Sequence, residues 1–145
     1  MKLQIFKLLK VSLSDIIIGG CMMMFPLVGY SQPPASTWAA PPNADNMSNP
    51  YGVDETVIAA GKDLFATSCA NCHGKRGRGD GPKAEELDKT PGDLTAAAFR
   101  TQTDGAIFWK IAEGNKPMPS FKSELTEEQR WMIVTYIREL GKKAE

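Results

Sequence analysis

Two cysteines and a histidine stand together in the sequence CANCH at residues 69–73. The chain of 145 residues has three cysteines and one histidine, so this stretch holds two of the thiols and the only imidazole. Thiols and imidazoles can bind a metal, form a redox-active disulfide, or hold a prosthetic group. The spacing of Cys69, Cys72 and His73 therefore raises three chemical possibilities.

The metal and disulfide possibilities match the sequence poorly. A structural zinc site needs four ligands, and no second Cys or His pair follows, so such a site would have to recruit carboxylates. A thioredoxin-like redox pair belongs in a βαβ unit, whereas the pattern around residues 69–73 is helical.

The third possibility explains every residue of the motif. CxxCH is the signature of a c-type haem, in which two thiols add to the two vinyl groups of the porphyrin. The two-residue spacer sets the separation of the thiols, and the histidine that follows is placed under the iron. The sequence therefore predicts one haem c attached through Cys69 and Cys72, with His73 as an axial ligand of the iron.

A second axial ligand must come from another residue type, since no second histidine exists. Beyond residue 31 the methionines are Met47, in a Pro-rich stretch, Met132, on an apolar stripe, and Met118. Met118 stands between Pro117 and Pro119, which hold the backbone out of a helix. We predict Met118 as the distal ligand, whose thioether favours ferrous iron; the alternative is a Met that fills a gap in the core.

The N-terminus has the features of a secretory signal. Lys2, Lys7 and Lys10 precede an uncharged run of 15 residues, 16–30, which is shorter than the roughly 17 residues that a membrane-spanning helix needs. We predict a signal peptide over residues 1–31 and a protein located in the periplasm.

Two alternatives for the N-terminus stay open. Residues 18–21, IGGC, resemble a bacterial lipobox, in which Cys21 would become a lipidated first residue and tether the protein to the membrane. An uncleaved anchor is the other alternative. Each of them also places the functional domain outside the cytoplasm.

The charge balance excludes some partners. The full chain has 17 basic and 17 acidic residues, and the removal of residues 1–31 would leave a formal charge of −2. Neither balance indicates a surface for nucleic acid. Residues 32–50 contain five of the ten prolines and are predicted to be an extended linker or loosely packed arm.

Three amphipathic helices are predicted beyond the linker. The first follows a cap at Asp54 and leads directly to Cys69; the second, 103–114, has Asp104 as its cap and Gly114 as its stop. The third starts with a capping box of Thr126 and Gln129 and ends at Gly141. Their predicted buried faces are Val57, Gly61, Leu64, Phe65 and Ser68; Ile107, Phe108 and Ile111; and Met132, Ile133, Tyr136, Ile137 and Leu140.

The fold class that follows is all-α, with one domain over residues 51–141 and a polar tail over 142–145. Three helices and long Gly- and Pro-rich loops bury little apolar surface for such a small domain. The sequence is therefore that of a shell around a cofactor.

From about residue 51 to 140 the chain resembles a class I monohaem cytochrome c. Besides CxxCH, Gly61 and Phe65 resemble the point where the N-terminal helix of that family crosses its C-terminal partner, here 136–138. The segments CHGKRGRGDGP, PGDLT, FWKIAEG and KPMPSF occur in the expected order. The resemblance implies a cytochrome c fold, closest to small bacterial periplasmic cytochromes and to cytochrome domains attached to oxidases and dehydrogenases.

The resemblance also implies roles for residues around the haem. His73 Nδ1 would donate to a backbone carbonyl, Pro82 being the first candidate and Gly81 the second. Trp109 Nε1 would either donate to a propionate or belong to the core. The implied haem wall consists of Leu94, Phe99, Ile107, Trp109 and Phe121.

Electron transfer is the predicted function, without catalysis by the chain alone. A monomer would exchange electrons with transient redox partners such as a dehydrogenase, reductase or oxidase, as a free carrier or a dedicated subunit. Lys75, Arg76 and Arg78 form either a solvated loop or a docking patch, which Lys116 and Lys122 could extend.

The alternative function is an open-iron haem protein, either a gas sensor or a haem enzyme, which requires that Met118 does not hold the iron.

Overall fold

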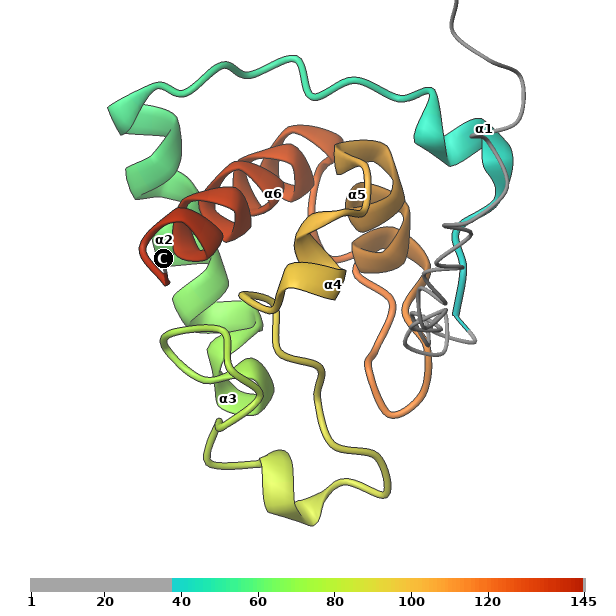
Figure 1. The fold of residues 1–145 in the computed structure, drawn as a ribbon, viewed down its shortest axis with the longest axis vertical. Helices are drawn as coiled ribbons and strands as arrows, with labels where there is room; N and C mark the ends of the chain where they lie inside the picture. The colour runs from blue at the N-terminus through green and yellow to red at the C-terminus, as the bar shows by residue number, and fades with distance from the viewer. Residues whose placement is uncertain (1–37, 145) are drawn as a thin grey trace, which may run out of the picture. The chain divides into compact units, whose positions relative to one another are not determined.

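The computed structural model describes residues 38–144, so the predicted signal segment and Cys21 lie outside the described residues. Helices make up the regular structure of this part of the chain, and no strand occurs in it (Figure 1). The all-α prediction is confirmed. The elements are α1 (Pro42–Asp45), α2 (Glu55–Ser68), α3 (Ala70–His73), the 3-10 helix η1 (Ala84–Glu86), α4 (Ala97–Arg100), α5 (Asp104–Glu113) and α6 (Glu127–Lys142).

The helices α2 and α6 cross in close contact at Gly61 (Figure 1). A Cβ atom on Gly61 would lie 2.1 Å from the carbonyl oxygen of Met132 and 3.0 Å from the Tyr136 Cβ. One turn further along α2, the Phe65 ring is buried 5.4 Å from the Tyr136 ring. The predicted crossing is therefore confirmed, and it depends on the absence of a side chain at Gly61.

Two of the predicted helix starts are confirmed by their hydrogen bonds. The Asp54 carboxylate accepts from the backbone N–H of Thr56 at 2.8 Å and of Val57 at 3.3 Å. Hydrogen bonds from the Thr56 hydroxyl and these N–H groups lower the pKa of Asp54. Thr126 and Gln129 form the reciprocal capping box of α6.

The predicted cap of α5 and the predicted end of α6 are wrong by one residue each. Thr103, not Asp104, caps α5: its hydroxyl accepts from the Ala106 N–H at 3.0 Å. Asp104 is already helical, and its carboxylate lies 2.7 Å from Arg138 Nε. Gly141 lies inside α6, where a Cβ would meet the Arg100 side chain at 3.0 Å. This glycine therefore provides room for a neighbour and does not end the helix.

The core between α5 and α6 is aromatic. Phe108 stacks on Trp131 with 4.1 Å between ring centroids, and the guanidinium of Arg130 lies 5.0 Å from the Phe108 ring. Arg130 is buried and donates to the carbonyl oxygens of Lys122, at 3.2 Å, and Leu125, at 2.5 Å. This arginine therefore ties the loop before α6 to the helix itself.

Residues 38–50, here named the N-terminal arm, pack against the helical domain and are not a loose linker over this range. Ala44 is 1% exposed. A Cβ atom on Gly105 would lie only 1.9 Å from the Ala44 carbonyl oxygen. The Thr103 hydroxyl donates to the Asp45 carboxylate at 2.7 Å. Composition alone predicted an extended stretch, because these long-range contacts leave no local signal.

None of the helices in residues 38–144 is both long enough and apolar enough to span a membrane.

The close approach at Gly61 generates a stability prediction. Gly61→Ala places a methyl group against the α6 backbone, so we expect the free energy of unfolding of the haem-loaded protein to fall by about 1–3 kcal/mol. Chemical denaturation followed by circular dichroism measures this. Gly52→Ala is the matched control, since nothing lies within 4 Å of a Cβ there. Equal stabilities of the two variants would contradict the packing argument.

Candidate functional site

The chain passes from α2 into the CxxCH motif without a loop. Cys69 ends α2 and starts α3, and its carbonyl oxygen accepts from the N–H groups of Cys72, at 3.2 Å, and His73, at 2.9 Å. Gly74, with φ 76°, ends this single turn. The two thiols and the imidazole are therefore held on one helical turn whose position is fixed by α2.

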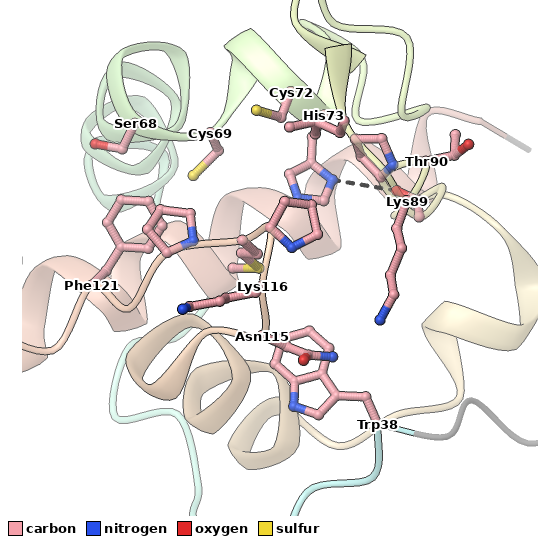
Figure 2. A pocket seen from close by; sticks show the side chains of 16 residues that line it. Trp38, Ser68, Cys69, Cys72, His73, Lys89, Thr90, Asn115, Lys116 and Phe121 are labelled. Atoms are coloured by element: carbon pink, nitrogen blue, oxygen red, sulfur yellow. Dashed lines mark hydrogen bonds between the residues drawn. The ribbon is translucent and has the colours of Figure 1, made fainter. Parts of the chain in front are cut away.

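A pocket opens next to this turn (Figure 2). Four parts of the chain line it: Trp38 of the N-terminal arm, residues 68–73, the loop 87–92 and the loop 115–121. Both cysteines, His73 and Met118 are among the lining residues. The prolines and aromatic rings around them make the rest of the lining largely apolar.

The imidazole of His73 is oriented by a backbone carbonyl. His73 Nδ1 lies 3.3 Å from the Gly92 carbonyl oxygen (Figure 2). An imidazole nitrogen that meets a carbonyl oxygen carries the proton, so Nε2 keeps its lone pair. Burial lowers the pKa of His73, and the bond to Gly92 opposes this only in part. The ring is therefore neutral at neutral pH and can act as a metal ligand.

The prediction of Pro82 as this acceptor, with Gly81 second, is wrong. The loop 79–83 folds over the C-terminal end of α3. The N–H of Gly81 donates to the Cys72 carbonyl at 3.1 Å, and the N–H of Lys83 donates to the Asn71 carbonyl at 2.8 Å. The N–H groups of this loop therefore form hydrogen bonds with the last carbonyl oxygens of α3. Pro82 itself is exposed. The loop 87–92 reaches the imidazole instead.

Met118 sits on a tight turn at the pocket. Asn115 and Met118 exchange two backbone hydrogen bonds, of 3.0 and 2.9 Å. The loop is also anchored to the end of α5, since the Phe121 N–H donates to the Ile111 carbonyl at 3.2 Å and the Ser120 hydroxyl to the Ala112 carbonyl at 2.5 Å. These bonds hold the half-buried Met118 side chain in the pocket lining.

The two cysteines are not joined by a disulfide, and they line a largely apolar pocket. Burial, with a smaller effect from Cys72, raises the pKa of Cys69 to about 12. Residues 38–144 contain no group of three or more His, Cys, Asp or Glu side chains that could hold a bare metal ion. The donor set of two thiols, a neutral imidazole and a thioether around one pocket fits a covalently attached haem better than it fits zinc.

The other residues of the implied haem wall are divided between two places. Phe121 lines the pocket with Met118. Leu94 and Phe99 line a second hollow, beside Ile137 of α6. Ile107 is buried and Trp109 half-buried on α5, and neither lines the pocket.

Sequence reasoning missed Trp38 and Lys89 as lining residues. Both stand in stretches that carried no sequence signal of their own: the Pro-rich arm and the polar loop after η1.

The family of the chain follows from comparison with known proteins. A family model described as cytochrome c oxidase, cbb3-type, subunit III matches residues 56–137, which is more than half of the chain. The chain belongs to this family. It is a c-type cytochrome, a class of protein with covalently attached haem c. The class I resemblance stated from the sequence is confirmed.

Individual relatives support the same conclusion. A cytochrome c6 of Parathermosynechococcus lividus is 29% identical over 59% of this chain and 93% of its own length. The cytochrome bc1 complex cytochrome c subunit of Corynebacterium diphtheriae is 29% identical over 60% of this chain. A solved structure of the Kuenenia stuttgartiensis reducing HAO-like protein complex matches 65% of this chain with a TM-score of 0.57 and 31% identity.

The chain spans only 28% of the length of the Corynebacterium subunit and 49% of the Kuenenia chain.

The thiols generate the second prediction. Cys69→Ala with Cys72→Ala should give a chain that loses all haem under denaturing conditions, because no covalent bond remains. Haem staining of a denaturing gel tests this. Ser68→Ala, which changes a neighbouring residue of the pocket, is the control and should keep the stain. Without haem to fill the pocket, the double variant should also unfold at lower temperature in circular dichroism. Unchanged folding would contradict the description of the domain as a shell around a cofactor.

Proposed function

We propose that this cytochrome is an electron carrier outside the cytoplasm, with one haem c bound through Cys69 and Cys72 and ligated by His73 and Met118. The observation that carries the proposal is that both thiols, the imidazole and the thioether line one pocket. The haem supplies a one-electron couple. The chain supplies the attachment, two axial ligands and an apolar surrounding.

Each ligand is supported by its own restraint. The Gly92 carbonyl holds the His73 ring so that Nε2 is available. The Asn115–Met118 turn holds the thioether on a loop anchored to α5. A thioether ligand favours the ferrous state and raises the reduction potential. If His73 and Met118 both hold the iron, no coordination position would remain for a substrate.

The chain is proposed to catalyse no reaction alone. Its single histidine is assigned to the iron, which leaves no imidazole for acid–base chemistry. The partners are proposed to be redox proteins that bind transiently. Two of the relatives are named as parts of complexes, a bc1 complex and an HAO-like complex. These names support a subunit dedicated to one complex, and a freely diffusing carrier is the other form of the proposal. The N-terminal sequence supports a periplasmic location, with a signal peptide or a lipid on Cys21.

Met118 provides the deciding experiment. Met118→Ala should keep haem attached, lower the midpoint potential, and allow carbon monoxide to bind ferrous iron, because the thioether is removed. The spectrum of the ferrous protein is recorded with and without carbon monoxide. The midpoint potential is measured by redox titration.

Met47→Ala is the matched control, since Met47 is a methionine of the N-terminal arm outside the pocket lining. The parent and the control should not respond to carbon monoxide. A parent that responds rapidly would instead support the open-iron alternative.

The basic cluster, defined as Lys75, Arg76 and Arg78, is proposed to steer acidic partners. All three residues are exposed and follow His73 by two to five positions. Gly74, Gly77 and Gly79 have positive φ angles near 75°, so the loop turns tightly and keeps the charges near α3. Charges of one sign near the site of electron exchange raise association rates more than affinity.

Reversal of this charge should change reaction rates with small charged oxidants. Glu in place of all three residues should slow oxidation by the ferricyanide anion and speed oxidation by a cationic cobalt complex, with smaller differences at high salt. Stopped-flow kinetics measures both rates. Lys62→Glu, an exposed site on α2 two turns before Cys69, is the control. Equal effects of the two variants on both rates would mean that the basic cluster is only a solvated loop and does not steer partners.

A further inference from the structure

Trp38 is a pocket residue that lies outside the family's matched region. The family match begins at residue 56, and Trp38 belongs to the N-terminal arm. Nevertheless its half-buried side chain lines the same pocket as Cys69, His73 and Met118. In Figure 2 the two cysteines lie at one end of the pocket, and Trp38 lies at the other end, near Asn115.

The arm that carries Trp38 is fixed on the domain at several points. Gly105 leaves room for the carbonyl oxygens of Ala44 and Met47, which lie 1.9 and 2.8 Å from where its Cβ would be. Asn49 donates to the Thr135 hydroxyl at 3.0 Å. The placement of the arm is therefore determined by α5 and α6.

The indole itself has a charged neighbour. The Lys110 ammonium lies 5.3 Å from the Trp38 ring centroid, a distance typical of a cation–π contact. Lys110 also donates to the Gln102 side chain. This lysine therefore holds the ring of Trp38 against α5 at the end of the pocket.

The covalent chemistry of haem c decides what this end of the pocket faces. The thioether bonds form at the vinyl groups, and the propionates project from the opposite edge of the porphyrin. If the vinyl edge lies at Cys69 and Cys72, the propionate edge would lie toward Trp38, at the other end of the pocket. Lys89 lines the pocket as well and adds positive charge to the lining.

We propose that Trp38 is a haem-contact residue that closes the propionate edge of the pocket against water. Ferric haem carries one more positive charge than ferrous haem, so exclusion of water favours the ferrous state and raises the potential. A closed edge also slows the access of outside ligands that compete with Met118. This inference rests on the proposed attachment and ligation of the haem.

The experiment uses the full chain, produced in a strain that attaches haem c. Two quantities are measured for each variant: the midpoint potential, and the rate at which imidazole binds the ferric protein. Trp38→Ala should shift the potential downward and increase the imidazole rate. Trp38→Phe keeps an aromatic ring and should recover most of both values.

A second variant displaces the N-terminal arm from the pocket and leaves Trp38 itself unchanged. Gly105→Ala places a methyl group against the arm backbone, so it should displace the arm and shift both quantities in the same direction. Gly52→Ala is the control, because its Cβ meets nothing within 4 Å, and it should match the parent.

Two results would overturn the inference. Trp38→Ala could match Gly52→Ala in both quantities, or it could lower only the unfolding temperature, which would give Trp38 a structural role alone. Rapid binding of carbon monoxide by the parent would instead overturn the ligation by Met118. The two failures are therefore distinguishable.

Discussion

The position of a single helical turn, residues 69–73, is the constraint on which the rest of the structure depends. A haem attached through two thiols can only sit where that turn places it, so the turn must be rigid. It continues directly from α2, and α2 is held by its crossing with α6 at Gly61. A contact more than two turns away from the thiols therefore sets the height and direction of the attachment site.

The opposite wall of the pocket is built by different means. The Met118 loop has no helix of its own, and it is held by its internal turn, by the Phe121 N–H bond to the Ile111 carbonyl and by the Ser120 hydroxyl bond to the Ala112 carbonyl. The following segment is fixed by Arg130, which donates to its carbonyls from α6. The two proposed ligands thus belong to two separately anchored walls, and α6 is common to both. Two ligands held by contacts outside the iron would suit the proposed electron carrier.

Burial and hydrogen bonding act on the pKa of His73 in opposite directions. Burial lowers the pKa of His73 and raises that of Cys69, so both groups are neutral in the pocket at neutral pH. The carbonyl of Gly92 then selects which imidazole nitrogen carries the proton. An apolar pocket with a single oriented acceptor is therefore enough to present a neutral ligand, and no carboxylate is needed behind the imidazole.

The sequence by itself determined the parts of this protein whose signals are local. The CxxCH motif indicates haem c because its residues lie on one turn. The sequence also predicts the caps at Asp54 and Thr126, because their partners lie two or three residues away. Met118 stands out in the sequence because prolines flank it and only two other methionines follow residue 31.

Only the tertiary structure decided the features that join distant segments. The acceptor of His73 is nineteen residues away and lies on a loop that the chain brings back to the ring. Trp38 lines the pocket because the N-terminal arm packs against Gly105 of α5. The composition of the arm indicates a linker, since Gly105 lies far from it in the sequence. Such contacts depend on complementary shape and on the close approach of two backbone segments. The residues of one segment alone do not determine either property.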